Sequence, residues 1–460
     1  MKNFQPHTLA LALAVAFPSL AAAQSNEELM KELLALKERV GQLESALKAK
    51  DAAKPADAEK QWGMTPAQVQ DFNRVSLKTE ALEDAIEAQG FKGLKISGQM
   101  DPSFIYNKSQ NRAGFQFLNS VGDDGYNYDN SYFGMALIDF QKEMEGGTKW
   151  RLTLAPNRGV GAVVDGQSVV HEASVSVPLG DLQNRLIAGQ IPDWSGYEYL
   201  PPTQNKLITH NLLFDFTLPT AYTGAGMEVA SGKWIMKGVL ANMNASRKSR
   251  FNKTPVFAYR GDYSKGEYAG FGFAGVHGKA ANFRSDDVNP VTGNAYDNRD
   301  STLNLLEVDA YFIRGDWTVQ GQVSYGQQQN GAITADSVTG ELRDSRWYGA
   351  SALAAYKITP RLEGIARIDY LNNKKHGGGL LGYTFADDRN GIGPDPFGDP
   401  EAGANRMALS VGMGYLFSSN LTFKAEYRLD RASQAVFVDV KDGRYSKSNH
   451  LLGASMVLSF

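Results

Sequence analysis

The sequence predicts an all-β protein, a sixteen-stranded antiparallel transmembrane β-barrel with an N-terminal α-helical coiled-coil extension. Three observations lead to this prediction. Apolar residues recur every three or four positions before Gly93 and every second position after it. The connections between the period-two segments alternate between short and long, and the last segment is amphipathic and ends at Phe460. Alternating segments of about ten residues, separated by turn residues, are typical of strands that cross a membrane.

The first part of the chain predicts an exported protein. Lys2 is followed by an apolar run at residues 9–17 and by three alanines at residues 21–23, which is the order of a secretory signal peptide. We therefore expect residues 1–23 to be removed. Cysteine is absent, so no disulfide stabilises the fold, and the formal net charge of -3 argues against a nucleic-acid partner.

Residues 24–50 have the pattern of a coiled coil. Their apolar residues are spaced alternately by four and three positions, at Leu29, Leu33, Leu36, Val40, Leu43 and Leu47. Leucine at nearly every core position is compatible with a trimer. Residues 51–63 predict a flexible linker, and residues 64–93 predict an amphipathic helix with Pro66 in its first turn. This second helix either packs on the body of the protein or forms a second oligomeric coil.

After Gly93 the sequence divides into sixteen period-two segments. They are residues 94–107, 131–144, 148–157, 169–178, 184–192, 223–231, 233–245, 254–264, 268–280, 302–314, 316–328, 346–358, 361–372, 405–417, 420–431 and 448–460. No run of about 18 apolar residues follows the signal peptide, so no membrane-spanning helix is expected. A closed barrel is the remaining structure that satisfies every backbone polar group inside a membrane.

Short and long connections alternate along the whole array of segments. The long ones are residues 108–130, 158–168, 193–222, 246–253, 281–301, 329–345, 373–404 and 432–447, and a short turn lies between each pair. A membrane barrel requires this asymmetry, because its short turns lie at one rim and its long loops at the other. A soluble sandwich or solenoid does not impose it.

The two-residue period also predicts which side chains face the barrel interior. In residues 420–431, Phe423 belongs to the outer face, whereas Lys424 and Glu426 belong to the inner face. The candidate lumen-lining residues are Lys149, Arg151, Arg260, Glu307, Asp309, Arg361, Glu363, Arg367, Lys424, Glu426 and Arg428, joined by Lys95, Glu172, Asp262, Asp369 and Arg406. Their polarity predicts a water-filled channel, and the small basic excess favours anions. Alternatively, the inner charges pair across a plugged or narrow lumen.

The connection at residues 193–222 is long and aromatic, and we expect it to constrict the channel. A structureless connection of this length is uncommon in a compact domain, and its aromatic content argues against disorder. The candidate constriction residues are Asp193, Trp194, Tyr197, Glu198, Tyr199, Lys206, His210 and Asp215. The aromatic ones either offer flat faces to a sugar or aromatic ligand or pack the loop against the wall. Residues 211–217 leave the strand count ambiguous.

No catalytic constellation is evident in the sequence. A thiol nucleophile is absent, and the histidines at 171, 210, 277, 376 and 450 do not have the spacing of a zinc protease. We therefore expect no enzymatic activity, no cofactor and no metal. Residues 387–401 combine carboxylates with glycines, so they form either a calcium site or, because the usual calcium-loop spacing is missing, a solvated acidic loop.

The strand count, the alternating connections, the terminal Phe460 and the long connection after the fifth strand together resemble trimeric general porins of Gram-negative bacteria, over residues 94–460. The resemblance implies a homotrimeric channel surrounded by lipid of the cell outer membrane, with Phe460 as the signal for the barrel assembly machinery. In that family the loop after the fifth strand folds inward and narrows the pore, and residues 193–222 occupy this position. The acidic, glycine-containing motif of that loop is absent here, so the selectivity of the family does not carry over.

The helical extension resembles those of sugar porins and periplasm-spanning porins, which implies N-terminal helices in the periplasm. As a whole, the sequence is similar to an uncharacterised family of proteobacterial porin-like proteins, and this resemblance supplies no substrate. Three functions are compatible with these features. They are a passive channel for small hydrophilic solutes, a channel selective for a sugar or small anion, and an outer-membrane tether or adhesin that is not a channel.

Overall fold

The computed structural model describes residues 37–42, 44–45, 66–88, 92–116, 134–155, 169–244, 255–264, 266–281, 287–296, 300–381 and 383–460. The chain divides into two compact units, Met1–Lys92 and Gly93–Phe460. The expected signal peptide and the expected linker at residues 51–63 lie outside the described residues, as do large parts of the long connections after residues 116, 155 and 244.

The N-terminal unit is helical wherever it is described. Residues 37–42 and 44–45 are helical, inside the expected coiled coil, and helix α3 spans Pro66–Ala88. Proline suits the first helical position, because the N–H that it lacks would have no partner there. Phe72 of α3 is exposed. None of the described helices is long and apolar enough to cross a membrane. Assembly of these helices into an oligomeric coil stays a prediction.

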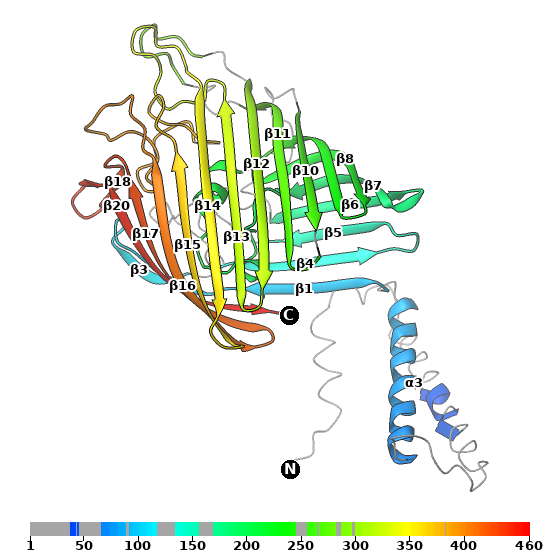
Figure 1. The fold of residues 1–460 in the computed structure, drawn as a ribbon. Helices are drawn as coiled ribbons and strands as arrows, with labels where there is room; N and C mark the ends of the chain where they lie inside the picture. The colour runs from blue at the N-terminus through cyan, green and yellow to red at the C-terminus, as the bar shows by residue number, and fades with distance from the viewer. Residues whose placement is uncertain are drawn as a thin grey trace. The chain divides into compact units, whose positions relative to one another are not determined.

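The C-terminal unit is a closed antiparallel barrel (Figure 1). Its sheet holds 18 strand segments, but β1 and β2 are halves of one wall strand and β3 is a short addition, so the wall has sixteen strands. The segments are β1 (Leu94–Met100), β2 (Ser103–Asn107), β3 (Arg112–Gln116), β4 (Ala136–Glu143), β5 (Lys149–Leu154), β6 (Val170–Leu179), β7 (Asp181–Pro192), β8 (Ala221–Ser231), β9 (Trp234–Met243), β10 (Val256–Ser264), β11 (Ala269–Ala281), β12 (Asp300–Arg314), β13 (Trp317–Gln328), β14 (Ser345–Lys357), β15 (Leu362–Asn372), β16 (Arg406–Ser418), β17 (Leu421–Ala432) and β20 (Ser448–Ser459). A separate small hairpin, β18 (Phe437–Val438) and β19 (Tyr445–Ser446), lies in the last long connection. The sixteen-stranded prediction is confirmed, with strand ends that differ by a few residues.

The barrel closes between its first and last strands. β20 pairs with β17 on one side and with β1 and β2 on the other. Gly98 and Phe460 exchange two backbone hydrogen bonds of 3.1 and 3.0 Å. A closed sheet leaves no row of unpaired backbone groups at an edge. The C-terminal residue therefore completes the wall.

A short strand that the sequence prediction missed lies beside this seam. Pro102 has no backbone N–H, and the first wall strand is interrupted there between β1 and β2. β4 pairs with β1, whereas β2 pairs with β3, which returns through a turn in which Asn111 has a φ of 46°. β3 has only five residues and lies in the segment predicted as a long loop. A period-two pattern is not distinctive over so short a run.

The side chains alternate between the two faces of the wall as the two-residue period predicts. In β17, Phe423 is exposed, whereas Lys424 and Glu426 are buried. Exposed aromatic residues also cluster beside short turns, where the rings of Trp317 and Tyr356 lie 4.8 Å apart. Such positions suit the interface between lipid and water. The facing of these strands is therefore that of a barrel with an apolar exterior.

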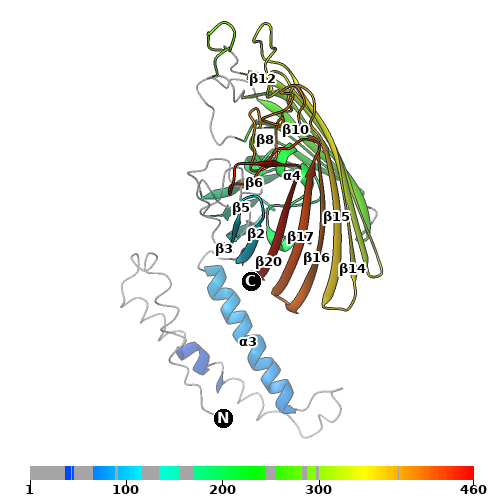
Figure 2. The same cartoon turned by 90° about the vertical axis from the view of Figure 1, so that its left-hand side faces the viewer.

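One side of the barrel interior is an apolar core that the sequence analysis did not predict. Between β7 and β8 the chain enters the barrel and forms helix α4 (Leu212–Thr217), which lies against β13–β16 on their concave side (Figure 2). Leu212, Leu213 and Phe216 pack there against inward residues of the wall. These are Val239, Ala241, Val256, Ala258, Val276, Leu303, Leu305, Trp347, Leu371 and Ala408. The expectation of a polar, wet interior is wrong for this side of the barrel.

The ambiguous residues 211–217 are therefore helical and do not form a strand. The side chain of Asn211 accepts hydrogen bonds from the backbone N–H groups of Leu213 and Phe214, so it caps the N-terminus of α4. Thr217 returns a hydroxyl hydrogen bond to the Leu213 carbonyl at 2.7 Å. These local bonds satisfy much of the backbone of a helix that is too short to be stable alone.

Two glycines of β13 compare its two faces, because Gly326 lies on the packed inner face and Gly321 lies on the outer face. A Cβ on Gly326 would lie 2.1 Å from the ring of the fully buried Trp347, whereas a Cβ on Gly321 would meet nothing closer than 3.5 Å. We predict that Gly326→Ala lowers the free energy of unfolding by about 1–3 kcal/mol, because the indole ring must leave its packed position. Gly321→Ala should change it by less than about 0.5 kcal/mol. Urea unfolding in detergent, followed by circular dichroism, measures both, and equal stabilities would contradict this packing.

Candidate functional site

The inward loop, residues 193–220, is closed at its base by hydrogen bonds. The backbone N–H of Asp193 donates to the Thr220 carbonyl at 3.0 Å. The Asp193 carboxylate accepts from the Ser195 N–H at 2.9 Å and from the Tyr222 hydroxyl at 2.5 Å. Beyond this base, a single 3-10 turn, η1 (Pro202–Gln204), precedes α4. The loop therefore leaves and rejoins the wall at neighbouring points, and its residues in between reach into the barrel.

Three basic side chains of the opposite wall bind the backbone of the inward loop. Arg367 Nη1 donates to the Thr209 carbonyl at 2.6 Å, and Arg428 Nη1 donates to the His210 carbonyl at 2.6 Å. Lys424 Nζ donates to the Pro202 carbonyl at 2.6 Å and to a second carbonyl three residues later. All three side chains are buried. Buried carbonyl groups need such partners, because leaving them without one costs about 1–3 kcal/mol each.

An acidic side chain completes this attachment. Glu426 Oε2 accepts from the backbone N–H groups of Ile208 and Thr209, both at 2.8 Å, and its Oε1 accepts from the Thr209 hydroxyl at 2.6 Å. The carboxylate therefore satisfies two consecutive backbone donors that have no partner in a helix or sheet. Together, the wall supplies both donors and acceptors to one short segment of the loop.

The anchoring side chains belong to a chain of buried ion pairs on β15, β16 and β17. Arg367 pairs with Glu198 of the loop at 2.8 Å and with Asp369 at 3.2 Å. Asp430 accepts from Arg428 at 3.2 Å and from Arg406 at 3.0 Å. Removing charges from water is compensated only when partners are close and further hydrogen bonds are made, as here. On this side of the barrel the inward charged residues pair with one another, which was the second of the two possibilities left open by the sequence.

The predicted constriction residues divide into two groups. Trp194, Tyr197, Lys206 and His210 attach the loop to its surroundings: the Trp194 ring lies 5.1 Å from that of Tyr222, and the Tyr197 hydroxyl lies 2.6 Å from Ser351 Oγ. Lys206 pairs with Glu363 at 2.8 Å, and His210 stacks on Phe214 at 4.2 Å. The second group, Asp193, Glu198, Tyr199 and Asp215, lines a cavity of about 880 Å³.

The predicted lumen-lining residues are also dispersed. Arg260 binds Asp309, Asp262 and Glu307, and together with Tyr199 it borders a separate cavity of about 250 Å³. Arg361, Glu363 and Lys424 border another cavity, of about 420 Å³, beside the short turns. Lys149 pairs with Glu143 at 3.4 Å. Of the predicted lumen-lining residues, Arg151 and Glu172 border the cavity of about 880 Å³.

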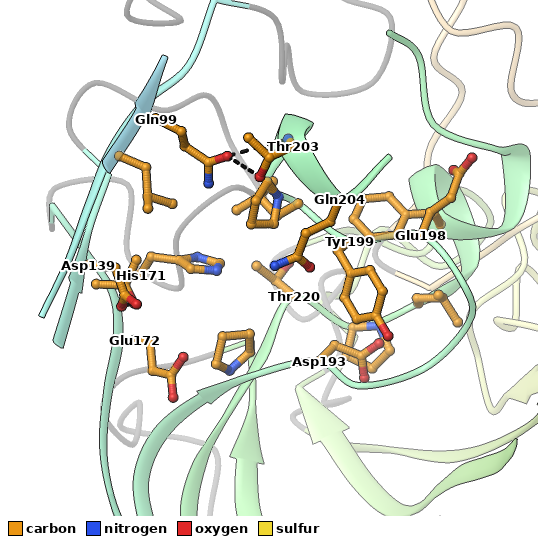
Figure 3. A pocket seen from close by; sticks show the side chains of 18 of the residues that line it. Gln99, Asp139, His171, Glu172, Asp193, Glu198, Tyr199, Thr203, Gln204 and Thr220 are labelled. Carbon is orange, nitrogen blue, oxygen red and sulfur yellow. Dashed lines mark hydrogen bonds between the residues drawn. The ribbon is translucent and has the colours of Figure 1, made fainter. Parts of the chain in front are cut away.

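This cavity of about 880 Å³ lies between the inward loop and the wall formed by β1, β4, β5 and β6 (Figure 3). Gln99, Asp139, His171 and Glu172 lie on the wall side in Figure 3, and Asp193 and Tyr199 lie on the loop side. Thr203 of the loop donates its hydroxyl to Gln99 at 2.5 Å and so fixes one border of the cavity. The cavity is bordered by Ser459 and Phe460 at the short-turn rim and by residues 381–390 of a long connection.

The wall side of the cavity carries a fixed cluster of charges. Arg151 Nε donates to Asp139 Oδ1 at 2.9 Å, and Arg151 Nη1 lies 3.4 Å from Glu172 Oε2. Thr153 and Ser174 donate to these two carboxylates at 2.6 Å each. Arg151 is the most accessible of the three charged side chains, with 41% of its side-chain surface exposed against 5% for Asp139 and 10% for Glu172. The guanidinium is thus held between two carboxylates at the surface of the cavity.

Sequence reasoning omitted Gln99 and Asp139 from the candidate residues. The two-residue alternation of their strands places both on the inner face, so the signal was present. His171, interpreted as an isolated surface or lumen histidine, also borders the cavity.

The acidic segment at residues 387–401 uses its carboxylates in turns. Asp387, Asp395 and Asp399 each accept a backbone N–H two or three residues later, at 2.9–3.1 Å. Arg343 Nη2 donates to Glu401 at 2.7 Å, and this hydrogen bond lowers the pKa of the Glu401 carboxyl. Within the described residues, no group of three His, Cys, Asp or Glu side chains is arranged to hold a metal ion.

Comparison with known families identifies the family of the chain. The profile of a family described as "Protein of unknown function (DUF3138)" matches residues 65–460. The chain belongs to this DUF3138 family. None of the curated proteins compared with it matches.

Solved structures similar to this DUF3138 protein are outer-membrane barrels. A loop-deletion variant of OmpT from Vibrio cholerae has a TM-score of 0.51 at 11% identity, over 80% of this chain and 99% of its own. The channel DcaP of Acinetobacter baumannii has a TM-score of 0.51 at 9% identity, over 80% and 97%. An anion-selective porin from Comamonas acidovorans has a TM-score of 0.50 at 8% identity, over 80% and 99%. At these identities the similarity establishes the fold, which is that of Gram-negative outer-membrane porins.

Substitution of Arg367 tests the attachment of the inward loop. Arg367→Ala leaves the carboxylates of Glu198 and Asp369 buried without their guanidinium partner, so we predict a loss of about 3–5 kcal/mol in the free energy of unfolding. The inward loop should also become sensitive to proteolysis in the folded barrel. Arg361 is exposed and makes no ion pair with any residue that the structure describes. Arg361→Ala is therefore the control, and an equal effect of the two substitutions would contradict the anchoring role.

Proposed function

We propose that the protein is an outer-membrane channel through which small hydrophilic solutes diffuse passively, with the inward loop as its constriction. The observation that carries this proposal is the extent of the 880 Å³ cavity, whose lining includes Phe460 and Ser459 at one rim and Tyr383, Asp387 and Asn390 in a long connection at the other. A polar lining suits hydrated solutes. The porin fold supports the same assignment, because barrels of this size commonly enclose aqueous channels.

The proposed path occupies only one side of the barrel. Residues of β1, β4, β5 and β6 form its wall, and the inward loop separates it from the rest of the interior. The other side is filled by α4 with its apolar neighbours and by the buried ion pairs that hold the loop. Gln204 and Tyr199 of the loop face Arg151 and Glu172 across the path, which makes this the expected constriction.

The anion-selective version of the channel has no support in the positions of the basic side chains. Arg260, Arg367 and Arg428 are buried and bonded to carboxylates or to the loop backbone. Arg151 faces the cavity, but two carboxylates flank it. A positive field needs basic groups that are not neutralised at short range. The general passive channel is therefore the better proposal.

We further propose a homotrimer embedded in outer-membrane lipid, with the N-terminal helices in the periplasm and Phe460 read by the barrel assembly machinery. Chemical crosslinking in mild detergent should yield a trimer as the largest species, because leucine-rich coils and porin barrels both allow this assembly. Crosslinking after removal of residues 24–60 shows whether the coil or the barrel holds the trimer together. A trimer that survives is held by the barrel, and one that is lost is held by the coil. A protein that crosslinks only as a monomer would contradict the proposal.

Single-channel recording tests the proposed function. Reconstituted in a planar lipid bilayer, the protein should open in uniform, ohmic steps. Deletion of residues 194–199 should raise the conductance of each step, because it removes Tyr199 from the cavity and the Glu198 anchor of the loop. Silence of correctly folded protein would overturn the channel assignment. An unchanged conductance of the deletion variant would place the loop outside the conducting path.

The absence of cysteine from the sequence allows a matched control for this experiment. Gln204→Cys introduces a thiol at the cavity, and a charged thiol reagent should then lower the conductance. Val276→Cys introduces a thiol into the apolar core beside α4, where the wild-type side chain is fully buried, and the reagent should have no effect. Each variant replaces a single side chain by the small side chain of cysteine, so the wall strands should stay intact.

A further inference from the structure

We propose that the large cavity favours small organic cations with a flat apolar face, such as arylalkylammonium ions, over anions and over aliphatic cations. This inference rests on the proposed channel function and specifies its solute class. It combines two independent properties of the cavity: an excess of carboxylates, and aromatic side chains exposed on the side of the loops.

Carboxyl groups outnumber basic groups along the described lining of the cavity. The acidic residues are Asp139, Glu172, Asp193, Glu198, Asp215 and Asp387, whereas Arg151 is the single lysine or arginine among the described lining residues. Glu198 is neutralised from behind by Arg367, which does not itself border the cavity. Arg151 neutralises at most one of its two flanking carboxylates. A cleft lined by an excess of one charge and enclosed by low-dielectric walls concentrates ions of the opposite charge.

Aromatic and apolar side chains border the same space from the loops. Tyr199 is 46% exposed and Phe385 is 59% exposed, so both rings are accessible. Phe214 and Tyr383 border the cavity beside them. The remaining apolar lining of this side is Pro192, Leu200, Pro201, Leu218, Pro219 and Leu381. Accessible aromatic faces bind both flat rings and cations, and the contact with a cation contributes about 0.5–2 kcal/mol.

The two properties face each other across the cavity. In Figure 3, Glu172 and His171 lie on the wall side and Tyr199 lies on the loop side, and all three line the same cavity. A solute with a ring on one side and an ammonium group on the other can therefore contact both sides at once. An anion meets one guanidinium that is already paired. An aliphatic cation can contact either the carboxylates or the rings with its ammonium group, but it has no ring to pack on the aromatic side at the same time. The volume of about 880 Å³ accommodates a single-ring solute with its water.

Block of the potassium chloride current through single reconstituted channels tests the inference. The probes are 2-phenylethylammonium, propylammonium and 3-phenylpropanoate. We expect 2-phenylethylammonium to reduce the current in a saturable manner, at a concentration about 10-fold lower than either of the others, which corresponds to about 1.4 kcal/mol. The reversal potential in a salt gradient should show a preference for potassium over chloride.

Matched variants assign the effect to the two sides of the cavity. Tyr199→Ala and Phe385→Ala should each weaken block by 2-phenylethylammonium about threefold or more, as expected for the loss of a contact between two aromatic rings. Glu172→Gln should weaken the block and shift the reversal potential toward chloride. The controls are Phe397→Ala and Glu341→Gln, which change exposed residues outside the cavity lining and should leave block and selectivity unchanged.

The outcomes separate this inference from the channel assignment. Ohmic conductance with equal responses to the three probes would overturn the inference and leave the passive channel standing. Equal block by benzyl alcohol, a neutral ring, would also overturn it, because the carboxylates would then contribute nothing. Absence of conductance in the folded protein overturns the proposed function itself.

Discussion

The interior of this barrel depends on charged side chains that bind the backbone of a loop. A segment folded into a barrel has carbonyl and N–H groups that neither a helix nor the sheet can satisfy. Arg367, Arg428 and Lys424 donate to the carbonyls of residues 202–210, and Glu426 accepts from two consecutive N–H groups there. These wall residues therefore determine where the loop lies, and the loop determines how much of the interior stays open. The charged groups of these four side chains are bonded to the loop, so they are not free to attract ions in the cavity.

Attachment of the loop divides the barrel into two unlike halves. On the side of β8–β16, inward valines, leucines and alanines pack against α4, which buries apolar surface at about 25 cal/mol per Å² and excludes water. On the side of β1 and β4–β6, inward residues such as Asp139 and Arg151 are polar and border the cavity. The sixteen-stranded wall therefore encloses a filled half and a half that contains the cavity. The wall acts as a frame, and α4, the inward loop and the buried ion pairs determine which part of the interior is filled.

Much of the wall could be predicted from the sequence, whereas the contents of the interior could not. A period of two residues is a local property, so it located the sixteen strands and showed that Phe423 and Lys424 lie on opposite faces. The same period says that a residue faces inward but not what it meets there. Arg367 and Thr209 are 158 residues apart in the sequence, so no local pattern predicts the hydrogen bond between them. The brief strand β3 and the helical residues 211–217 were too short for periodicity to identify.

The separation in sequence between the loop and its anchors constrains the order in which the interior can form. The inward loop lies after the fifth wall strand, but the side chains that bind it belong to β15 and β17, far along the chain. The loop can therefore dock only after the distal third of the wall has taken its place. Contacts of such high sequence separation are slow to form, because a long stretch of chain must be ordered first. Docking of the inward loop therefore depends on the prior placement of β15 and β17.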